Sequence, residues 1–351
     1  MLELIGPHWA VALIGLVTGT MLGLAARIGR FCTLGAIEDA LYGGSTLRLR
    51  MWAIAIGFSV LGTFALAGSG FIARGDTAYM LAAWNPWASV VGGLMFGYGM
   101  ALAGNCGYGA IARLGGGDLR AFVIVLVMGV STYVVLGGPL AELRVTIFPQ
   151  TLAQGTPPGI ADWLARLSGL SATLIGLALG AAILVGALAS PALRAKPGQI
   201  FWALVVGAAI VGAWAGTSWI ADAEFGATPV VSHSFAGPLG ESILWWMTAS
   251  GMPITFAVGS VAGVWFGALL GSLRLSHFRW EACEDPRELR RQIIGAGIMG
   301  AGAVIAMGCT VGQGISAFSV LAFSAPVTFA AIFAGAAVGL RQLITGFRLA
   351  V

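Results

Sequence analysis

The chain carries very little charge for its length. Only 9% of its 351 residues are Asp, Glu, Lys or Arg, and 58% are hydrophobic. A soluble domain carries about 25% charged residues, so this chain has too few charges to cover a surface that faces water. Its mean hydropathy of +0.92 agrees. These values exclude a soluble protein and indicate an all-α integral membrane protein.

Metal-ligand and nucleotide-binding motifs are also missing. The four cysteines show no C-x-x-C or Cys–His spacing, and the three histidines are scattered, which argues against a zinc or iron–sulphur site. We therefore expect no metal and no other cofactor. The sequence has no G-x-x-x-x-G-K-[ST] phosphate loop, so it does not predict ATP hydrolysis. The first residues lack a basic stretch and a cleavage site, and they predict a membrane helix rather than a removed signal peptide.

Long uncharged runs predict about nine membrane spans in one domain of residues 1–351. A spanning helix needs about 20 apolar residues. The spans are expected near 9–28, 51–72, 86–104, 120–139, 171–190, 200–220, 254–272, 292–308 and 325–343. The connecting segments 142–170 and 221–253 are long, and the sequence leaves open whether they form short helices at the membrane surface.

The basic residues predict an orientation. With an external N-terminus, only Arg74, Arg144 and Arg166 of the eighteen basic residues lie outside. Because basic residues concentrate on the cytoplasmic side, this asymmetry predicts an external N-terminus and a cytoplasmic C-terminus. It also accounts for the net charge of +4 without a nucleic-acid partner.

Two pairs of similar segments indicate an internal repeat. "GYGMALAGNCGYG" (97–109) aligns with "GAGAVIAMGCTVG" (300–312), and "GLVTGTMLG" (15–23) aligns with "GSVAGVWFG" (259–267). The predicted helices 86–104 and 292–308 run in opposite directions, as expected of an inverted repeat. We predict halves of about 9–140 and 171–343, although small-residue spacing is common in membrane helices for packing alone.

The pattern Cys-x-x-Gly occurs three times, at Cys32, Cys106 and Cys309. Each cysteine precedes a short apolar stretch that is too short to span, which predicts a re-entrant half-helix. The free N–H groups at such a helix start form an anion site without Lys or Arg. A thiol is a soft, weak donor that suits a ligand offering sulphur. Cys283 lies in a charged loop without glycines, and we interpret it as incidental.

Several neighbours of these thiols are candidate binding residues. The glycines that would let a ligand approach the backbone are Gly35, Gly107, Gly109 and Gly312. Asn105, Thr33, Thr310 and Gln313 either donate hydrogen bonds to a ligand or cap the half-helices. We expect Glu38 and Asp39 to pair with Arg27 or Arg30.

At these residues the chain resembles the YeeE/YedE family of bacterial sulphur transporters. The segments "GRFCTLGA", "GNCGYGA" and "GCTVGQGISA" are similar to the family's motifs, and the resemblance covers nearly the whole chain. It implies an hourglass-shaped inner-membrane protein with short helices that dip towards a thin centre. It also implies that thiosulfate passes between Cys32, Cys106 and Cys309 through S–H···S hydrogen bonds. A separate TusA-like sulphur-carrier protein in the cytoplasm is the partner that the resemblance implies, and a monomer is expected to suffice.

Other functions remain open on the sequence. The transported compound could be another sulphur or selenium compound. A membrane redox enzyme or sulphur transferase would need a base or cation beside each nucleophilic thiol, and only Cys32 has cations nearby, at Arg27 and Arg30. We therefore expect no catalytic residues. In a structural subunit, the glycines would serve helix packing only.

Overall fold

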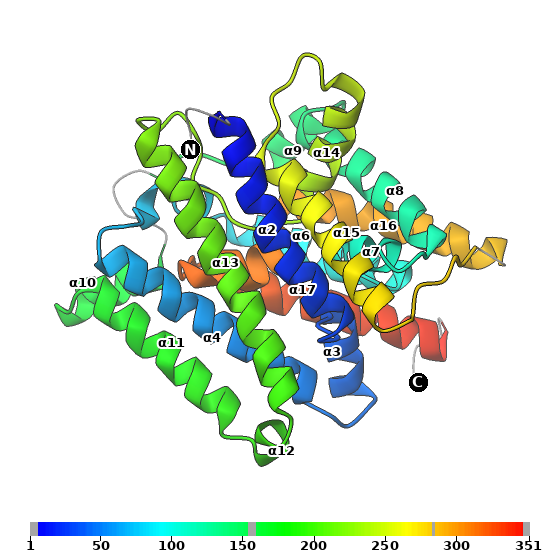
Figure 1. The fold of residues 1–351 in the computed structure, drawn as a ribbon, viewed down its shortest axis with the longest axis horizontal. Coiled ribbons are helices and arrows are strands. Elements are labelled where there is room, and N and C mark those ends of the chain that lie inside the picture. Colours follow the sequence, from blue (N-terminus) through cyan, green and yellow to red (C-terminus); the bar gives the residue numbers. More distant parts are fainter. Residues whose placement is uncertain (1–5, 154–158, 283–284, 347–351) are drawn as a thin grey trace.

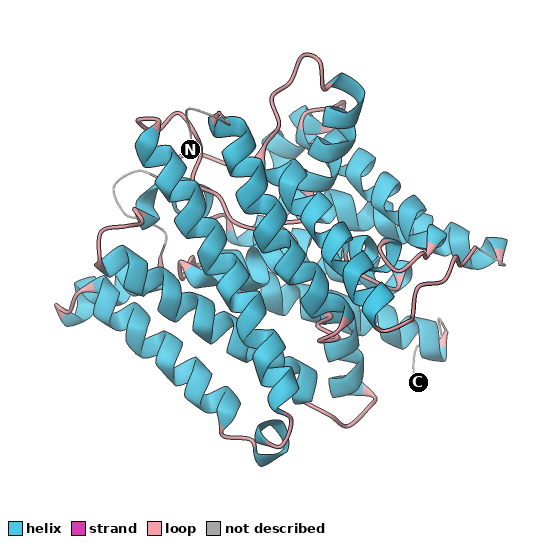
Figure 2. Cartoon of the chain, in the orientation of Figure 1, coloured by secondary structure: helices cyan, strands magenta, loops and turns pink. Residues whose placement is uncertain are grey.

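The computed structural model describes residues 6–153, 159–282 and 285–346. These residues form helices joined by turns and loops, without a β-strand in the described part of the chain (Figures 1 and 2). The elements are α2 (Pro7–Arg27), α3 (Thr33–Leu41), α4 (Leu47–Gly68), η1 (Arg74–Asp76), α5 (Ala78–Leu81), α6 (Pro86–Ala103), α7 (Gly107–Leu114), α8 (Leu119–Leu136), α9 (Ala141–Ile147), α10 (Ile160–Ser168), α11 (Ala172–Leu188), α12 (Pro191–Arg194), α13 (Pro197–Ala223), α14 (Gly237–Thr248), α15 (Phe256–Arg274), α16 (Pro286–Ile305), η2 (Gly312–Ala317) and α17 (Ser324–Thr345).

A long helix lies in each of the nine ranges predicted to span. Among the described residues, seven helices are long and apolar enough to cross a membrane, counting α6 and α7 as one interrupted span. The pair α10–α11, bent by 117°, makes an eighth if it is one span. The remaining helix, α16, carries four charged residues in its first two turns. The all-α membrane fold is confirmed, and the count of nine spans stays a prediction.

The helices begin where capping residues and prolines allow. Asn85 and Asp118 accept hydrogen bonds from the first turns of α6 and α8, which satisfies amide groups that have no partner within the helix. Pro7 and Pro197 stand in the first turns of α2 and α13, where a missing N–H costs nothing. The long connections contain the short helices α9, α10 and α14.

Glycines set the spacing between the central helices. A Cβ on Gly15, Gly19 or Gly23 of α2 would overlap the backbone of α15, and a Cβ on Gly97 of α6 would overlap Ile332 of α17. In lipid, such close backbone approach supplies the packing that holds helices together. The glycines therefore bring the backbones of two helix pairs, α2 with α15 and α6 with α17, into direct contact.

The helix contacts agree with an inverted relation for one of the two proposed repeat matches but not for the other. On the α6–α16 pair, Gly92 lies against Gly302 and Gly99 lies against Gly295, so these helices run antiparallel with reciprocal contacts. This agrees with an inverted relation between the two cysteine segments. On the α2–α15 pair, contacts advance in the same direction along both helices. Parallel helices cannot be an inverted pair, so this second match reflects packing. The halves 9–140 and 171–343 stay a prediction.

The tight glycine contacts predict a position-specific loss of stability. Gly97→Ala should lower the melting temperature of the purified protein in detergent, because overpacking costs about 1–3 kcal/mol. Gly297 of α16 has open space at its Cβ position, so Gly297→Ala should be neutral or stabilising, since alanine favours helix by about 1 kcal/mol. Equal melting temperatures for the two variants would contradict the close approach of α6 and α17.

Candidate functional site

Each of the three Cys-x-x-Gly thiols stands at the start of a short helical segment. Cys32 is the N-cap of α3 and Cys106 is the N-cap of α7. Cys309 directly precedes a helical stretch, 310–319, that contains the π-helical η2. The predicted short helix is therefore present after every one of these thiols. One difference concerns α7, which continues the direction of α6 as part of an interrupted span, Pro86–Leu114, rather than turning back.

Two of the thiols accept hydrogen bonds from the helix starts. The Cys106 sulphur accepts the Gly109 N–H at 3.4 Å, and the Cys309 sulphur accepts the Gly312 N–H, also at 3.4 Å. Cys309 also accepts the Phe235 N–H at 3.2 Å. The glycine of Cys-x-x-Gly thus supplies the amide that faces the sulphur. Because both sulphur atoms act as acceptors, their own hydrogens are left to donate to another group.

The fold brings the thiols together from three distant parts of the sequence. Cys106 lies within electrostatic range of both Cys32 and Cys309, and the Thr310 side chain lies against the Cys106 thiol. Cys106 and Cys309 are each 1% exposed, whereas Cys32 is half-buried. Cys106 is therefore close to both of the other thiols.

Buried polar atoms without partners surround these thiols. Thr33 Oγ1, Asn105 Oδ1 and Gln313 Oε1 have no hydrogen-bond partner among the described residues, and Thr310 Oγ1 has the weakly bonding Cys106 thiol beside it. Neither Thr33 nor Asn105 makes a capping bond to α3 or α7, so the capping alternative does not apply to them. A buried unpaired polar atom costs about 1–3 kcal/mol, and a polar ligand that reached these atoms would relieve that cost. Such atoms are therefore candidate ligand contacts.

Gln313 and the other glycines shape the local backbone. The Gln313 side-chain amide donates to the carbonyls of Ala306 and Met307, which holds the turn just before Cys309. A Cβ on Gly107 would collide with Met128 and the Phe235 carbonyl, and a Cβ on Gly35 would collide with the Arg48 guanidinium. The Phe235 carbonyl leaves no room for a side chain at Gly107, whereas at Gly35 the flexible Arg48 side chain could move.

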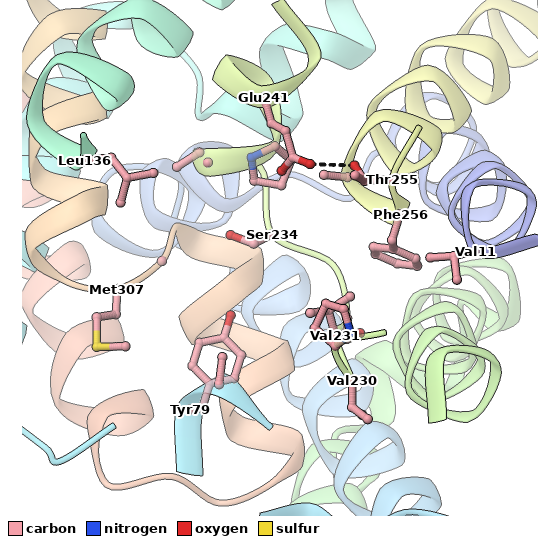
Figure 3. A pocket seen from close by; sticks show the side chains of 18 of the residues that line it. Val11, Tyr79, Leu136, Val230, Val231, Ser234, Glu241, Thr255, Phe256 and Met307 are labelled. Carbon is pink, nitrogen blue, oxygen red and sulfur yellow. Dashed lines mark hydrogen bonds between the residues drawn. The ribbon is translucent and has the colours of Figure 1, made fainter. Parts of the chain in front are cut away.

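One pocket, which we call the apolar pocket, lies next to Cys309 and has a volume of about 540 Å³. Figure 3 shows Val11, Leu136, Val230 and Phe256 among its walls, with Tyr79 and Ser234 deeper in. Ser234 Oγ lies 3.8 Å from the Cys309 sulphur. Glu241, on the wall, accepts a hydrogen bond from Thr255. No lysine or arginine lines this pocket.

The second pocket, which we call the arginine pocket, has a volume of about 500 Å³ and is lined by Cys32. Its other chemistry-bearing lining residues are Arg27, Arg30, Arg48, Arg113, Glu38, Asn105 and His277. The apolar pocket is lined by His8 at the start of α2, and the arginine pocket by Arg27 at its end. The two pockets therefore lie towards opposite ends of α2, with the buried Cys106 and Cys309 lining neither.

The acidic residues beside Cys32 pair differently from the prediction. Asp39 forms an ion pair with Arg48 at 3.2 Å, not with Arg27 or Arg30, because α3 turns its Asp39 side towards α4. Glu38 stands at the rim of the arginine pocket. Partial burial raises the pKa of the Glu38 carboxyl above its usual range, while Arg113 and Arg48 act to lower it.

The segment between α13 and α14 was not recognised from the sequence. His233 is fully buried, with one ring nitrogen 2.6 Å from Ser260 Oγ and the other 2.8 Å from Thr18 Oγ1. Its carbonyl accepts from Ser316. These bonds hold the neighbouring Phe235 N–H and Ser234 against Cys309. A histidine between two serines in an otherwise apolar loop was the available signal.

The fold and these pockets define an α-helical membrane protein with a chain of thiols between two opposed cavities. Comparison with known proteins identifies the family. The model of the sulphur transport family matches residues 28–338, and the chain belongs to that family. The chain is 26% identical over 323 residues to the thiosulfate transporter TsuA of Escherichia coli K12, covering 88% of this chain and 87% of that protein. It is 24% identical over 328 residues to the thiosulfate transporter TsuA of Spirochaeta thermophila, covering 88% and 92%.

The buried histidine gives a stability prediction. His233→Phe should lower the melting temperature in detergent, because the Ser260 hydroxyl loses its partner at a cost of about 1–3 kcal/mol. His8→Phe, at an exposed position on the rim of the apolar pocket, is the control and should change the melting temperature little. If the two variants melted alike, the network around His233 would not hold the 227–236 segment in place.

Proposed function

We propose that this protein carries thiosulfate across the bacterial inner membrane through the three thiols. The proposal rests on where the thiols lie: Cys309 is next to Ser234 of the apolar pocket, Cys32 lines the arginine pocket, and Cys106 is in range of both. From this we infer a path in the order Cys309, Cys106, Cys32. The names of the two relatives support thiosulfate as the substrate. The pockets on either side of a closed centre support the hourglass shape that the sequence resemblance implies.

The chemistry of the thiols suits brief holding of a sulphur anion. The terminal sulphur of thiosulfate is a soft acceptor, and each thiol hydrogen is a weak donor. Backbone N–H groups hold the sulphur atoms of Cys106 and Cys309 in place, so an S–H can point at the passing anion. Weak binding at several successive positions favours release as well as entry.

The flanking polar groups complete the proposed path. Thr310 can donate its hydroxyl hydrogen and Asn105 its side-chain amide N–H to an anion, whereas the Gln313 amide N–H holds the carbonyls of Ala306 and Met307 and so shapes the path. Gly107, Gly109 and Gly312 keep the backbone accessible. A hydroxyl hydrogen can turn from its present position to an anion's oxygen. A TusA-like carrier would receive the sulphur compound on the cytoplasmic side, and the single-chain path makes a monomer sufficient.

The thiols give a graded functional prediction. Expressed in a sulphur-auxotrophic bacterium with thiosulfate as the sole sulphur source, the native chain should restore growth. Replacing Cys32, Cys106 or Cys309 with Ala should abolish or sharply reduce growth at equal protein levels, because each removal interrupts the series. The control is Cys283→Ala, outside the described residues, which should grow normally. Normal growth of the Cys106→Ala strain would refute the thiol path.

The orientation is a separate prediction. We propose an external N-terminus, which puts the arginine pocket on the cytoplasmic side. In a background without Cys32 and Cys283, Tyr42→Cys should react with a membrane-impermeant maleimide only in inside-out vesicles. Leu152→Cys should react only in intact cells. Both positions are exposed, at 51% and 75%. The reverse pattern would invert the proposed direction of the path.

A further inference from the structure

The two pockets differ sharply in charge. Four arginines line the arginine pocket, whereas the apolar pocket has none. A thiol path alone needs no cation, since helix N–H groups suffice for an anion. The cytoplasmic bias of basic residues explains why arginines lie on this side, but it does not explain why four of them line one cavity beside a thiol.

Two of these arginines are already engaged. Arg48 is paired with Asp39, and Arg27 donates to the His277 carbonyl at 3.2 Å. Arg30 and Arg113 form no ion pair with a described residue. Among the described residues that line this pocket, Glu38 is the acidic one, and it lies within electrostatic range of Arg113. Arg30 also lines an adjoining pocket with Asp39, which is itself paired with Arg48. Two guanidinium groups are thus available for a ligand.

Arg30 is exposed and lines the arginine pocket from an unusual backbone conformation. It has a φ of 54°, in the left-handed region, at the break between α2 and α3. This conformation is uncommon for a residue other than glycine and costs free energy. Cys32 follows two residues later, so the same short turn presents both a guanidinium and a thiol to one cavity.

We propose that the arginine pocket is a binding site for a small sulphur oxyanion that carries a terminal sulphur. Arg30 and Arg113 bind its oxygens, and the Cys32 thiol faces its sulphur. Guanidinium forks match oxyanion oxygens, and the soft thiol matches the sulphur. This inference rests on the proposed function for the choice of anion, and it adds a holding site where the anion leaves the thiols. The charge would favour movement from the apolar pocket towards this one.

The local charge can be measured without any transported compound. In a Cys283→Ala background, Cys32 is the half-buried thiol beside two buried ones. A methanethiosulfonate reagent carrying a sulfonate and one carrying a trimethylammonium are compared, each relative to its rate with a free small thiol. The anionic reagent should be favoured, since a charged cleft changes encounter rates by about 10-fold or more.

Substitutions then test which residues create this preference. Arg30→Gln and Arg113→Gln should each reduce the preference several-fold, and Glu38→Gln should increase it. Arg274→Gln is the matched control, because Arg274 is exposed at the end of α15 and does not line the pocket. Melting temperatures identify any variant that fails to fold. A preference unchanged in both arginine variants, or reduced equally in Arg274→Gln, would overturn the proposal.

Binding is measured separately by isothermal titration of the Cys106→Ala protein with thiosulfate and with sulfate. Thiosulfate should bind more tightly, and Arg113→Gln in this background should weaken both anions about tenfold or more. Cys32→Ala should weaken thiosulfate alone, to the level of sulfate. Equal binding of both anions with no effect of Cys32→Ala would overturn the role of the thiol here. If the native chain bound thiosulfate in this way but did not restore growth on thiosulfate, the proposed function would be contradicted and the proposed binding site would not.

Discussion

The central constraint is that backbone N–H groups cannot be left unsatisfied inside a membrane. This protein interrupts its helices near the centre, and each interruption exposes the amides of a helix start. At Cys106 and Cys309 a sulphur atom accepts the third amide, from Gly109 and Gly312. Sulphur is a weaker acceptor than a carboxylate or hydroxyl oxygen, so these amides are satisfied only loosely. The positive helix ends therefore stay attractive to an anion, and the bound thiols stay in position to meet it. An aspartate cap would satisfy the amides fully but would also repel the anion.

That arrangement requires close packing elsewhere. The interrupted segments reach the centre because α6 lies against both α16 and α17 through glycines, and α2 lies against α15 in the same way. The 227–236 segment, of which His233, Phe235 and Ala236 are buried, lies between Cys309 and the apolar pocket and is fixed by His233 between Thr18 and Ser260. Helix packing thus determines where the thiols stand, and the loop determines what Cys309 touches. With Cys106 and Cys309 buried, the centre is closed in this structure.

The sequence was sufficient for the parts of the structure that depend on local pattern. Hydropathy located the long helices, and the Cys-x-x-Gly repeat located the three helix starts. The sequence predicted contacts between distant segments less well. The likeness of 15–23 and 259–267 suggested a duplication, but the same glycine spacing also serves the parallel packing of α2 against α15, which only the contacts reveal. His233 was missed because its partners, Thr18 and Ser260, belong to other helices. The pairing of Asp39 with Arg48 likewise depends on how α3 turns against α4, which no short-range pattern encodes.

The surroundings of the thiols also bear on the alternative of a thiol enzyme. A nucleophilic cysteine needs a neighbouring base or cation to form its thiolate. His233 is the histidine near Cys309, since it lies two residues before Phe235, whose N–H group Cys309 accepts. Both of its ring nitrogens are hydrogen-bonded to hydroxyl groups and so are not free to act as a base. Cys106 faces the Thr310 hydroxyl and a backbone amide, and neither can take its proton. Only Cys32 lies beside guanidinium groups. Two of the three thiols thus lack the neighbouring base or cation that a thiol relay would need, and this favours the proposed anion path over redox chemistry.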